Sequence, residues 1–181
     1  SLTQNSRTRQ ITLIGLMTAI TCILAPLSIP LPFSPVPISL TNLVIFISVF
    51  ILGMKDATIS FLIYLLLGSV GLPVFASFHA GLSVLAGPTG GYLIGFIFLA
   101  LIQGFAMKYF DRKLIPTIIG MLIGMAVCYI FGTVWLAKLM SLSFKEGLFM
   151  GVIPYLPGDA VKIIIAVIVG PKLYAATKKV R

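Results

Sequence analysis

Ionisable side chains are scarce in this sequence. Of its 181 residues only 9% are charged, with four acidic residues and a single histidine, whereas 59% are hydrophobic. Water-soluble domains have about 25% charged residues, so this chain lacks the polar surface that water would solvate. We therefore expect one all-α integral membrane domain that covers residues 1–181.

Motifs for catalysis, metal binding and nucleotide binding are also lacking. Cys22 and Cys128 lie far apart within apolar runs, without the spacing of a disulfide framework or a zinc site. The sequence has no paired carboxylates and no serine nucleophile with a base, so we predict no catalytic residues, no metal ligands and no enzymatic activity. GxxxxGK[ST] and GxGxxG patterns are absent too, which predicts that the chain has no ATP or dinucleotide site of its own.

What the sequence does contain is six apolar segments, separated by charged residues or by proline and glycine. They cover residues of about 10–25, 38–54, 56–70, 90–109, 114–139 and 158–177. Several are shorter than the roughly 20 residues of an ideal transmembrane helix, which suits an irregular membrane domain. No small-residue cleavage site follows the first segment, so we expect a retained span rather than a signal peptide.

The thirteen basic residues, which give a net charge of +9, are distributed unevenly between the two faces that six spans define. Lys162 apart, ten lie near the two termini, at Lys55 and in the turn from Lys108 to Lys113, all on one face. The other face receives only Lys138 and Lys145. The positive-inside rule therefore predicts that both termini are cytoplasmic. Nucleic-acid binding is disfavoured, because no basic stripe carries interleaved aromatic residues.

The loops predicted on the extracellular face are long and irregular. Residues 26–37 hold five prolines and no charge, and residues 71–91 are rich in glycine. Loops of this length without regular structure are usually functional or disordered, and the second is too apolar to be disordered. We expect it to fold back against the helices as a lid or re-entrant element that lines a cavity. The third loop, residues 141–157, carries several aromatic residues.

Two ionisable residues, Asp159 and Lys162, lie at the outer end of the last span in the stretch LPGDAVK. Their i, i+3 spacing puts both on one face of a helix. In one interpretation Asp159 caps the helix N-terminus and Lys162 extends outward to the surface. In the other, both face the interior and bind a polar substrate, because ionisable residues within a membrane are commonly functional.

Other polar groups are weaker candidates for substrate contacts. The glycine-rich stretch around Thr89, Gly91 and Tyr92 could present backbone N–H groups to an anion, or it could simply form a turn. The single histidine, His79, lies in the second outer loop and could be structural or bind substrate. The amide residues within spans could join helices or contact a substrate; they are Asn42 and Gln103.

Small residues recur at four-residue spacing on two spans, which lets helices approach closely. On the fifth span they are Gly120, Gly124, Cys128 and Gly132, and we expect them to serve internal packing. On the first span, Gly15 and Ala19 serve either internal packing or docking to another subunit.

Over essentially its whole length the chain resembles the BioY family, the biotin-specific S components of energy-coupling-factor (ECF) vitamin transporters. The motifs that carry the resemblance are GLPVF from Gly71, LAGPTGGYLIGF from Leu85 and LPGDAVK from Leu156. The resemblance implies a six-helix protein of a prokaryotic plasma membrane that captures biotin from outside. It also implies docking through the first helix onto a transmembrane coupling subunit with two ATPase subunits, so that ATP is bound only by these partners and the chain itself needs no cofactor.

The resemblance also suggests roles for individual residues. The docking motif Ala-x-x-x-Ala of the family is here Gly15-Leu-Met-Thr-Ala19, and a glycine run of the second outer loop is here SFHAG around His79. Asp159 is expected to accept hydrogen bonds from the ureido N–H groups of biotin, and Lys162 to donate to its carbonyl or its carboxylate. Phe75 is expected to supply an apolar wall, and the further substrate contacts are Thr89, Gly91, Tyr92, Asn42 and His79. Alternatives are an S component for another vitamin or a stand-alone facilitator of a small solute.

Overall fold

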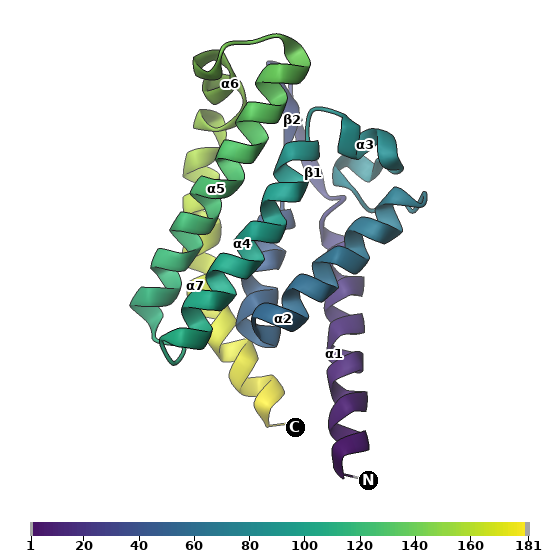
Figure 1. Cartoon of the computed structure of the whole chain (residues 1–181), viewed down its shortest axis with the longest axis vertical. Helices are drawn as coiled ribbons and strands as arrows, with labels where there is room; N and C mark the ends of the chain where they lie inside the picture. The colour runs from purple at the N-terminus through teal and green to yellow at the C-terminus, as the bar shows by residue number, and fades with distance from the viewer. Residues whose placement is uncertain (1, 180–181) are drawn as a thin grey trace.

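Five long helices dominate the structure, a computed structural model that describes residues 2–179. They are α1 (Leu2–Leu24), α2 (Thr41–Ser69), α4 (Gly90–Tyr109), α5 (Leu114–Met140) and α7 (Leu156–Lys178). The shorter elements are β1 (Ser28–Leu31), β2 (Ser34–Ser39), η1 (Ala76–Phe78), α3 (Leu82–Ala86), α6 (Phe144–Gly151) and η2 (Ile153–Tyr155). Both termini lie at one end of the molecule, the terminal end, whereas the strands, α3 and α6 gather at the other, the loop end (Figure 1).

Helix α2 is broken at Gly53. The backbone there has φ 83° and ψ 180°, a conformation that glycine adopts readily because it has no Cβ atom. The two halves of α2 diverge from this break, which lies toward the terminal end (Figure 1). The segments predicted over residues 38–54 and 56–70 correspond to these two halves of one helix, and the break comes two residues before the predicted junction at Lys55.

Four helical stretches of the described chain are long and apolar enough to cross a membrane. They are Thr41–Ser69, Gly90–Tyr109, Leu114–Met140 and the run Phe144–Lys178. The spans predicted over residues 90–109, 114–139 and 158–177 therefore correspond closely to α4, α5 and α7. Helix α1 contains most of the first predicted span, but it is the least apolar of the long helices.

The prediction of an all-α chain is wrong for the first loop, which forms an antiparallel hairpin of β1 and β2. Ser28 pairs with Ser39, and Leu31 pairs with Ser34. Proline cannot donate a backbone hydrogen bond, but it is tolerated in edge strands. Both strands of a two-stranded sheet are edges, so the prolines of this loop are compatible with the hairpin.

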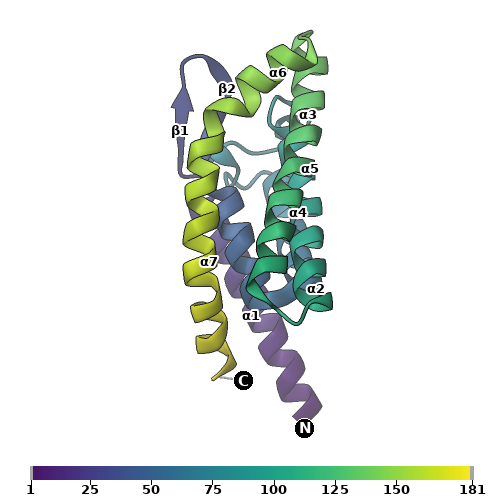
Figure 2. The ribbon, with the colours of Figure 1, turned by 90° about the vertical axis from the view of Figure 1, so that its left-hand side faces the viewer.

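The third predicted loop also contains regular structure, because α6 forms within it. Ser143 begins this helix with a capping box: its hydroxyl accepts from the backbone N–H of Glu146 at 3.2 Å, and the Glu146 carboxylate accepts from Ser143. Helix α6 then crosses the loop end from α5 to α7 (Figure 2).

Helices α4 and α5 pack closely through the glycines of α5. A Cβ atom on Gly124 would lie 2.6 Å from the Leu99 side chain, and one on Gly132 would lie 2.3 Å from the Tyr92 ring. Larger residues at these positions would therefore force the helices apart. This confirms the prediction that the small residues of the fifth span serve internal packing.

Gly104 of α4 packs similarly closely beside the break in α2. A Cβ atom there would lie 2.4 Å from Cα of Met54, a backbone atom that cannot rotate away. We expect Gly104→Ala to cost about 1–3 kcal/mol of stability through overpacking and to lower the midpoint of thermal unfolding in detergent. Gly15→Ala is the matched control, because nothing lies within 4 Å of that position. Equal midpoints for the two variants would contradict this packing.

Candidate functional site

A cavity of about 760 Å³ opens at the loop end, and loops supply much of its wall. This volume is in the range of small-molecule sites. Four residues predicted to contact substrate line it: Phe75, His79, Thr89 and Tyr92. None of the described residues that line it is a lysine, an arginine or an acidic residue. Its wall is therefore built from apolar groups and neutral hydrogen-bonding groups, together with His79.

The second loop folds back against the helices, as predicted, and closes one side of this cavity. Phe75 is only 1% exposed, and its ring packs against Gly68 of α2. The hydroxyl of Tyr64 in α2 donates to the carbonyl of Val74 at 2.8 Å. Ser77 in η1 shares a hydroxyl–hydroxyl bond of 2.7 Å with Ser28 of β1. The loop is thus joined both to the helices and to the hairpin.

The hairpin, which lines the cavity, is joined in turn to α6 and η2. The hydroxyl of Ser34 in β2 donates to the carbonyl of Met150 at 2.8 Å. The Tyr155 hydroxyl of η2 lies within hydrogen-bond reach of the Ser34 hydroxyl and the Val36 carbonyl, and it donates its one hydrogen to one of them at a time. Tyr92 donates to the carbonyl of Gly151 at 2.7 Å, so its hydroxyl also holds α6 in place. These side chains fix the loops that surround the cavity.

Asp159 and Lys162 form a buried polar cluster with Asn42 and Tyr129. The Lys162 ammonium lies 3.1 Å from the Asp159 carboxylate. The same oxygen of Asp159 accepts from the Asn42 amide at 2.8 Å, and the other oxygen accepts from the Tyr129 hydroxyl. Three elements contribute to the cluster: α7 carries the ion pair, α2 carries Asn42 and α5 carries Tyr129.

The hydrogen bonds of this cluster are complete. The Lys162 ammonium has three N–H donors, and three acceptors lie within hydrogen-bond distance of it. They are the backbone carbonyl of Ser39 at 2.6 Å, and the side-chain oxygen of Asn42 and the Asp159 carboxylate at 3.1 Å each. The side chains of Lys162 and Asp159 are only 12% and 10% exposed. A buried ion pair is costly unless further hydrogen bonds satisfy both charges, and here they do.

The structure contradicts the interpretation of Asp159 as a helix cap. Asp159 lies in the first turn of α7, and no side-chain hydrogen bond caps that helix. Lys162 likewise donates to groups inside the protein instead of extending to the surface. Both charged side chains therefore face the interior.

The cluster adjoins the cavity at the end of β2. Ser39 and Thr41 line the cavity. The Ser39 carbonyl accepts from Lys162, and the Ser39 hydroxyl donates to the Thr41 hydroxyl at 3.0 Å. Asp159, Lys162 and Asn42 themselves are not among the lining residues. Apart from Gly91, the predicted substrate contacts thus form two neighbouring sets, one in the cavity wall and one behind it.

Gly91, a predicted substrate contact, and Gln103, a weaker candidate, lie away from the cavity. Gly91 packs against α5, where an added Cβ atom would lie 2.5 Å from the carbonyl oxygen of Phe131, and it does not line the cavity. Gln103 donates to the Phe46 carbonyl at 3.1 Å, so it joins α4 to α2. The geometry gives neither residue a contact with the site.

Gly15 and Ala19, predicted to serve either internal packing or docking, lie on an exposed face of α1. Nothing in the described structure comes within 4 Å of a Cβ atom built on Gly15. The small residues of α1 are therefore not used for internal packing, in contrast to those of α5.

Sequence reasoning missed Tyr129 and Ser39. Tyrosine within an apolar span usually suggests a membrane interface, and nothing in the local pattern indicated that Tyr129 faces Asp159. Ser39 contributes its backbone carbonyl to Lys162, and a backbone acceptor leaves no signal in residue type.

Comparison with known proteins gives consistent matches over nearly the whole chain. The BioY family matches residues 2–179. The biotin transporter BioY2 of Lactococcus lactis subsp. cremoris is 32% identical over 173 residues, which cover 96% of this chain and 94% of that protein. The biotin transporter BioY of Thermotoga maritima is 34% identical over 165 residues, which cover 91% and 95%.

A solved structure is also similar. It is the crystal structure of the S-component for biotin from an ECF-type ABC transporter, which superposes with a TM-score of 0.87 at 31% sequence identity. The match covers 93% of this chain and 92% of that chain.

Removing one partner of the buried ion pair should be strongly destabilising. We expect Lys162→Met to cost about 3–5 kcal/mol, because it leaves the Asp159 carboxylate buried without its cation. Adding Asp159→Leu should recover part of this loss. The matched control is Lys172→Met, at an exposed lysine of the same helix. The measurement is thermal unfolding in detergent, and a Lys162→Met midpoint equal to that of the control would contradict the role of the pair.

Proposed function

The chain belongs to the BioY family, and on this premise we propose that it is the substrate-capture subunit of an ECF-type ABC transporter and that its ligand is biotin. It is a transport protein and not an enzyme. The observation that carries the proposal is the pairing of a largely apolar cavity with a buried carboxylate and ammonium at its edge. A small acid with one compact polar ring needs both kinds of surface.

The chemistry of biotin matches these groups. Its ureido ring offers two N–H donors and one carbonyl acceptor, and its valeryl chain is apolar and ends in a carboxylate. Asp159 accepts from the ureido N–H groups, and Lys162 donates to the ureido carbonyl or to the carboxylate. Phe75 and Tyr92 supply apolar wall for the chain, while Thr89, Asn42 and His79 supply further polar contacts. An analogue without the ureido group offers Asp159 no donor in exchange for one that it displaces, and it is rejected strongly.

Binding exchanges hydrogen bonds within the cluster. In the structure, Asp159 accepts from Lys162, Asn42 and Tyr129. A ureido N–H group takes the place of one of the two neutral donors, so the carboxylate never becomes unpaired. Such an exchange has a small net free energy, whereas leaving the carboxylate without a donor is costly. The cluster is thus prepared for the ligand.

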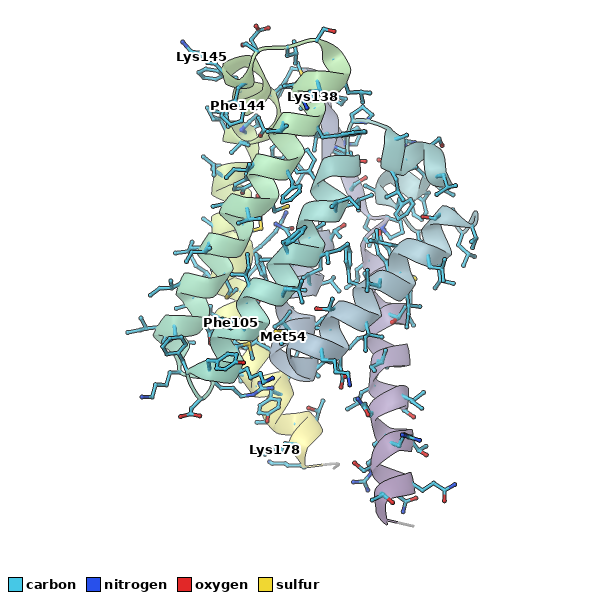
Figure 3. The ribbon with its side chains drawn as sticks, in the orientation of Figure 1. Met54, Phe105, Lys138, Phe144, Lys145 and Lys178 are labelled. Atoms are coloured by element: carbon cyan, nitrogen blue, oxygen red, sulfur yellow. The ribbon has the colours of Figure 1, made fainter. Side chains whose placement is uncertain are left out.

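The proposal includes an orientation in the membrane. The chain forms a single membrane domain of a prokaryotic plasma membrane with six spans: α1, the two halves of α2, α4, α5 and α7. Both termini are cytoplasmic, and the loop end is extracellular, where biotin arrives. The distribution of basic residues supports this orientation. Two lysines, Lys138 and Lys145, lie at the loop end, whereas the ten basic residues that the sequence assigns to the other face include Lys178, which lies at the terminal end (Figure 3).

The partners are a transmembrane coupling subunit and two ATPase subunits of an ECF module. Only these partners bind ATP, and the chain itself uses no cofactor. The exposed small-residue face of α1 at Gly15 and Ala19 is the docking surface, because small residues let the helix of a partner approach closely.

The role of the carboxylate can be tested with the variant Asp159→Asn. We expect it to weaken biotin binding about tenfold or more, a loss of at least ~1.4 kcal/mol, because an amide cannot accept from all the donors that a carboxylate accepts from. Isothermal titration calorimetry of the purified protein measures this. Asp56→Asn, at the terminal end, should bind like the wild type. Wild-type affinity of Asp159→Asn would refute the assignment.

The docking surface can be tested with Gly15→Leu. We expect this variant to bind biotin normally but to lose most of its co-purification with the coupling and ATPase subunits, because the leucine prevents close helix contact. Ala126→Leu is the matched control, since Ala126 is an exposed small residue on α5. Equal recovery of the module with both variants would show that α1 is not the docking helix.

A further inference from the structure

A second recess lies at the terminal end of the molecule, away from the outer loops. It has a volume of about 400 Å³ and is formed where the break in α2 meets the C-terminal end of α4 and the turn from α4 to α5. A neighbouring recess of about 460 Å³ continues it along the N-terminal part of α1. The two share Gln10, Leu52 and Asp56 in their walls. We call this continuous groove the basic recess.

Positive charge dominates the basic recess. Its walls contain four cationic side chains, Arg9, Lys55, Lys108 and Arg112, and one carboxylate, Asp56, which leaves a net charge of +3. Asp56 accepts from the Gln10 amide at 2.9 Å. Among the described residues, Asp159 and Lys162 form the only ion pair. Lys55 and Lys108 therefore face the recess without an acidic partner in the described chain.

The recess is built into the fold and is more than a set of surface lysines. Arg112 follows α4 in the turn to α5, and its guanidinium donates to the Phe50 carbonyl at 2.7 Å, beside the break in α2. The same guanidinium stacks on the Tyr174 ring of α7 at 3.6 Å. One wall of the recess is thus held by contacts that link the α4–α5 turn, α2 and α7.

Apolar and aromatic groups surround these charges. Leu52, Met54 and Met107 contribute apolar wall. Phe105, Tyr109 and Phe110 lie exposed on the end of α4 next to Lys108, and the rings of Phe105 and Tyr109 are 4.4 Å apart. Met54 and Phe105 lie at a similar height toward the terminal end (Figure 3). Exposed aromatic rings of this kind mark the level of the lipid headgroups.

We propose that the basic recess binds the phosphate headgroup of an anionic membrane lipid. Basic pockets between transmembrane helices are suited to such headgroups, because cations neutralise the phosphate while the acyl chains stay in the membrane. Lys55 and Lys108 contact the phosphate, and the apolar wall at Leu52 and Met107 contacts the start of the acyl chains. Free phosphate would use the same cations but would gain nothing from this wall.

The site is independent of biotin binding, and it can be tested by native mass spectrometry. The purified protein is incubated with equal amounts of phosphatidylglycerol and phosphatidylcholine that carry identical acyl chains. We expect the wild type to retain phosphatidylglycerol about fivefold more than phosphatidylcholine. The double variant K55Q/K108Q should lose this preference. The matched control K138Q/K145Q removes the same charge at the loop end and should keep it.

Arg112 is left unchanged in this test, since its contacts with Phe50 and Tyr174 support the fold. Thermal unfolding checks that both double variants are folded. If K55Q/K108Q is unstable, the single variants K55Q and K108Q should each show a reduced preference.

Four results would overturn the proposal. The first is equal retention of both lipids by the wild type. The second is equal loss of preference in the two double variants, which would assign the effect to total charge. The third is complete displacement of phosphatidylglycerol by millimolar inorganic phosphate, which would indicate a site for soluble anions. The fourth is a K55Q/K108Q variant that keeps its lipid preference but no longer co-purifies with the coupling and ATPase subunits, which would indicate a protein-docking surface.

Discussion

The buried ion pair of Asp159 and Lys162 is the interaction on which the rest of the structure depends. Two charges can stay at this depth only if every donor and acceptor between them has a partner. That requirement brings together the end of β2, the start of α2, the middle of α5 and the first turn of α7. In the proposed function, the same requirement governs ligand binding. A group that offers N–H donors and a carbonyl can replace partners of the pair without leaving a charge unsatisfied.

Glycine makes this convergence possible. The break at Gly53 turns α2 back on itself, so that its first half places Asn42 at the loop end while its second half supports the outer loop through Gly68 and Tyr64. Close packing of α4 against α5 positions Tyr92 beneath α6 and Tyr129 beside Asp159. Hydrogen bonds to η1 and to η2 then hold the cavity-lining hairpin in place. The loops are thus positioned by helices whose contacts allow little room for rearrangement.

The long helices could be predicted from the sequence because charge, proline and glycine interrupt the apolar segments clearly, and α4 begins and ends as expected. The inward orientation of Asp159 and Lys162 was one of two interpretations of their spacing, and the hydrogen bonds of the folded chain were needed to decide between them. The hairpin was missed because prolines usually argue against strands, yet a two-stranded sheet has only edges. Tyr129 and the Ser39 carbonyl were missed because their contacts join residues far apart in sequence. Gly91 looked like part of an anion site, but its lack of a side chain serves contact with α5.

The central claim is that the ion pair forms hydrogen bonds with the ureido ring of biotin. A structure of the complex with biotin tests this claim most directly. The account predicts a ureido nitrogen within hydrogen-bond distance of an Asp159 carboxylate oxygen. It also predicts that Asn42 or Tyr129 has released that oxygen and that the valeryl chain lies against Phe75 and Tyr92. Biotin bound only among the loop residues, with all the present hydrogen bonds of Asp159 and Lys162 unchanged, would contradict it.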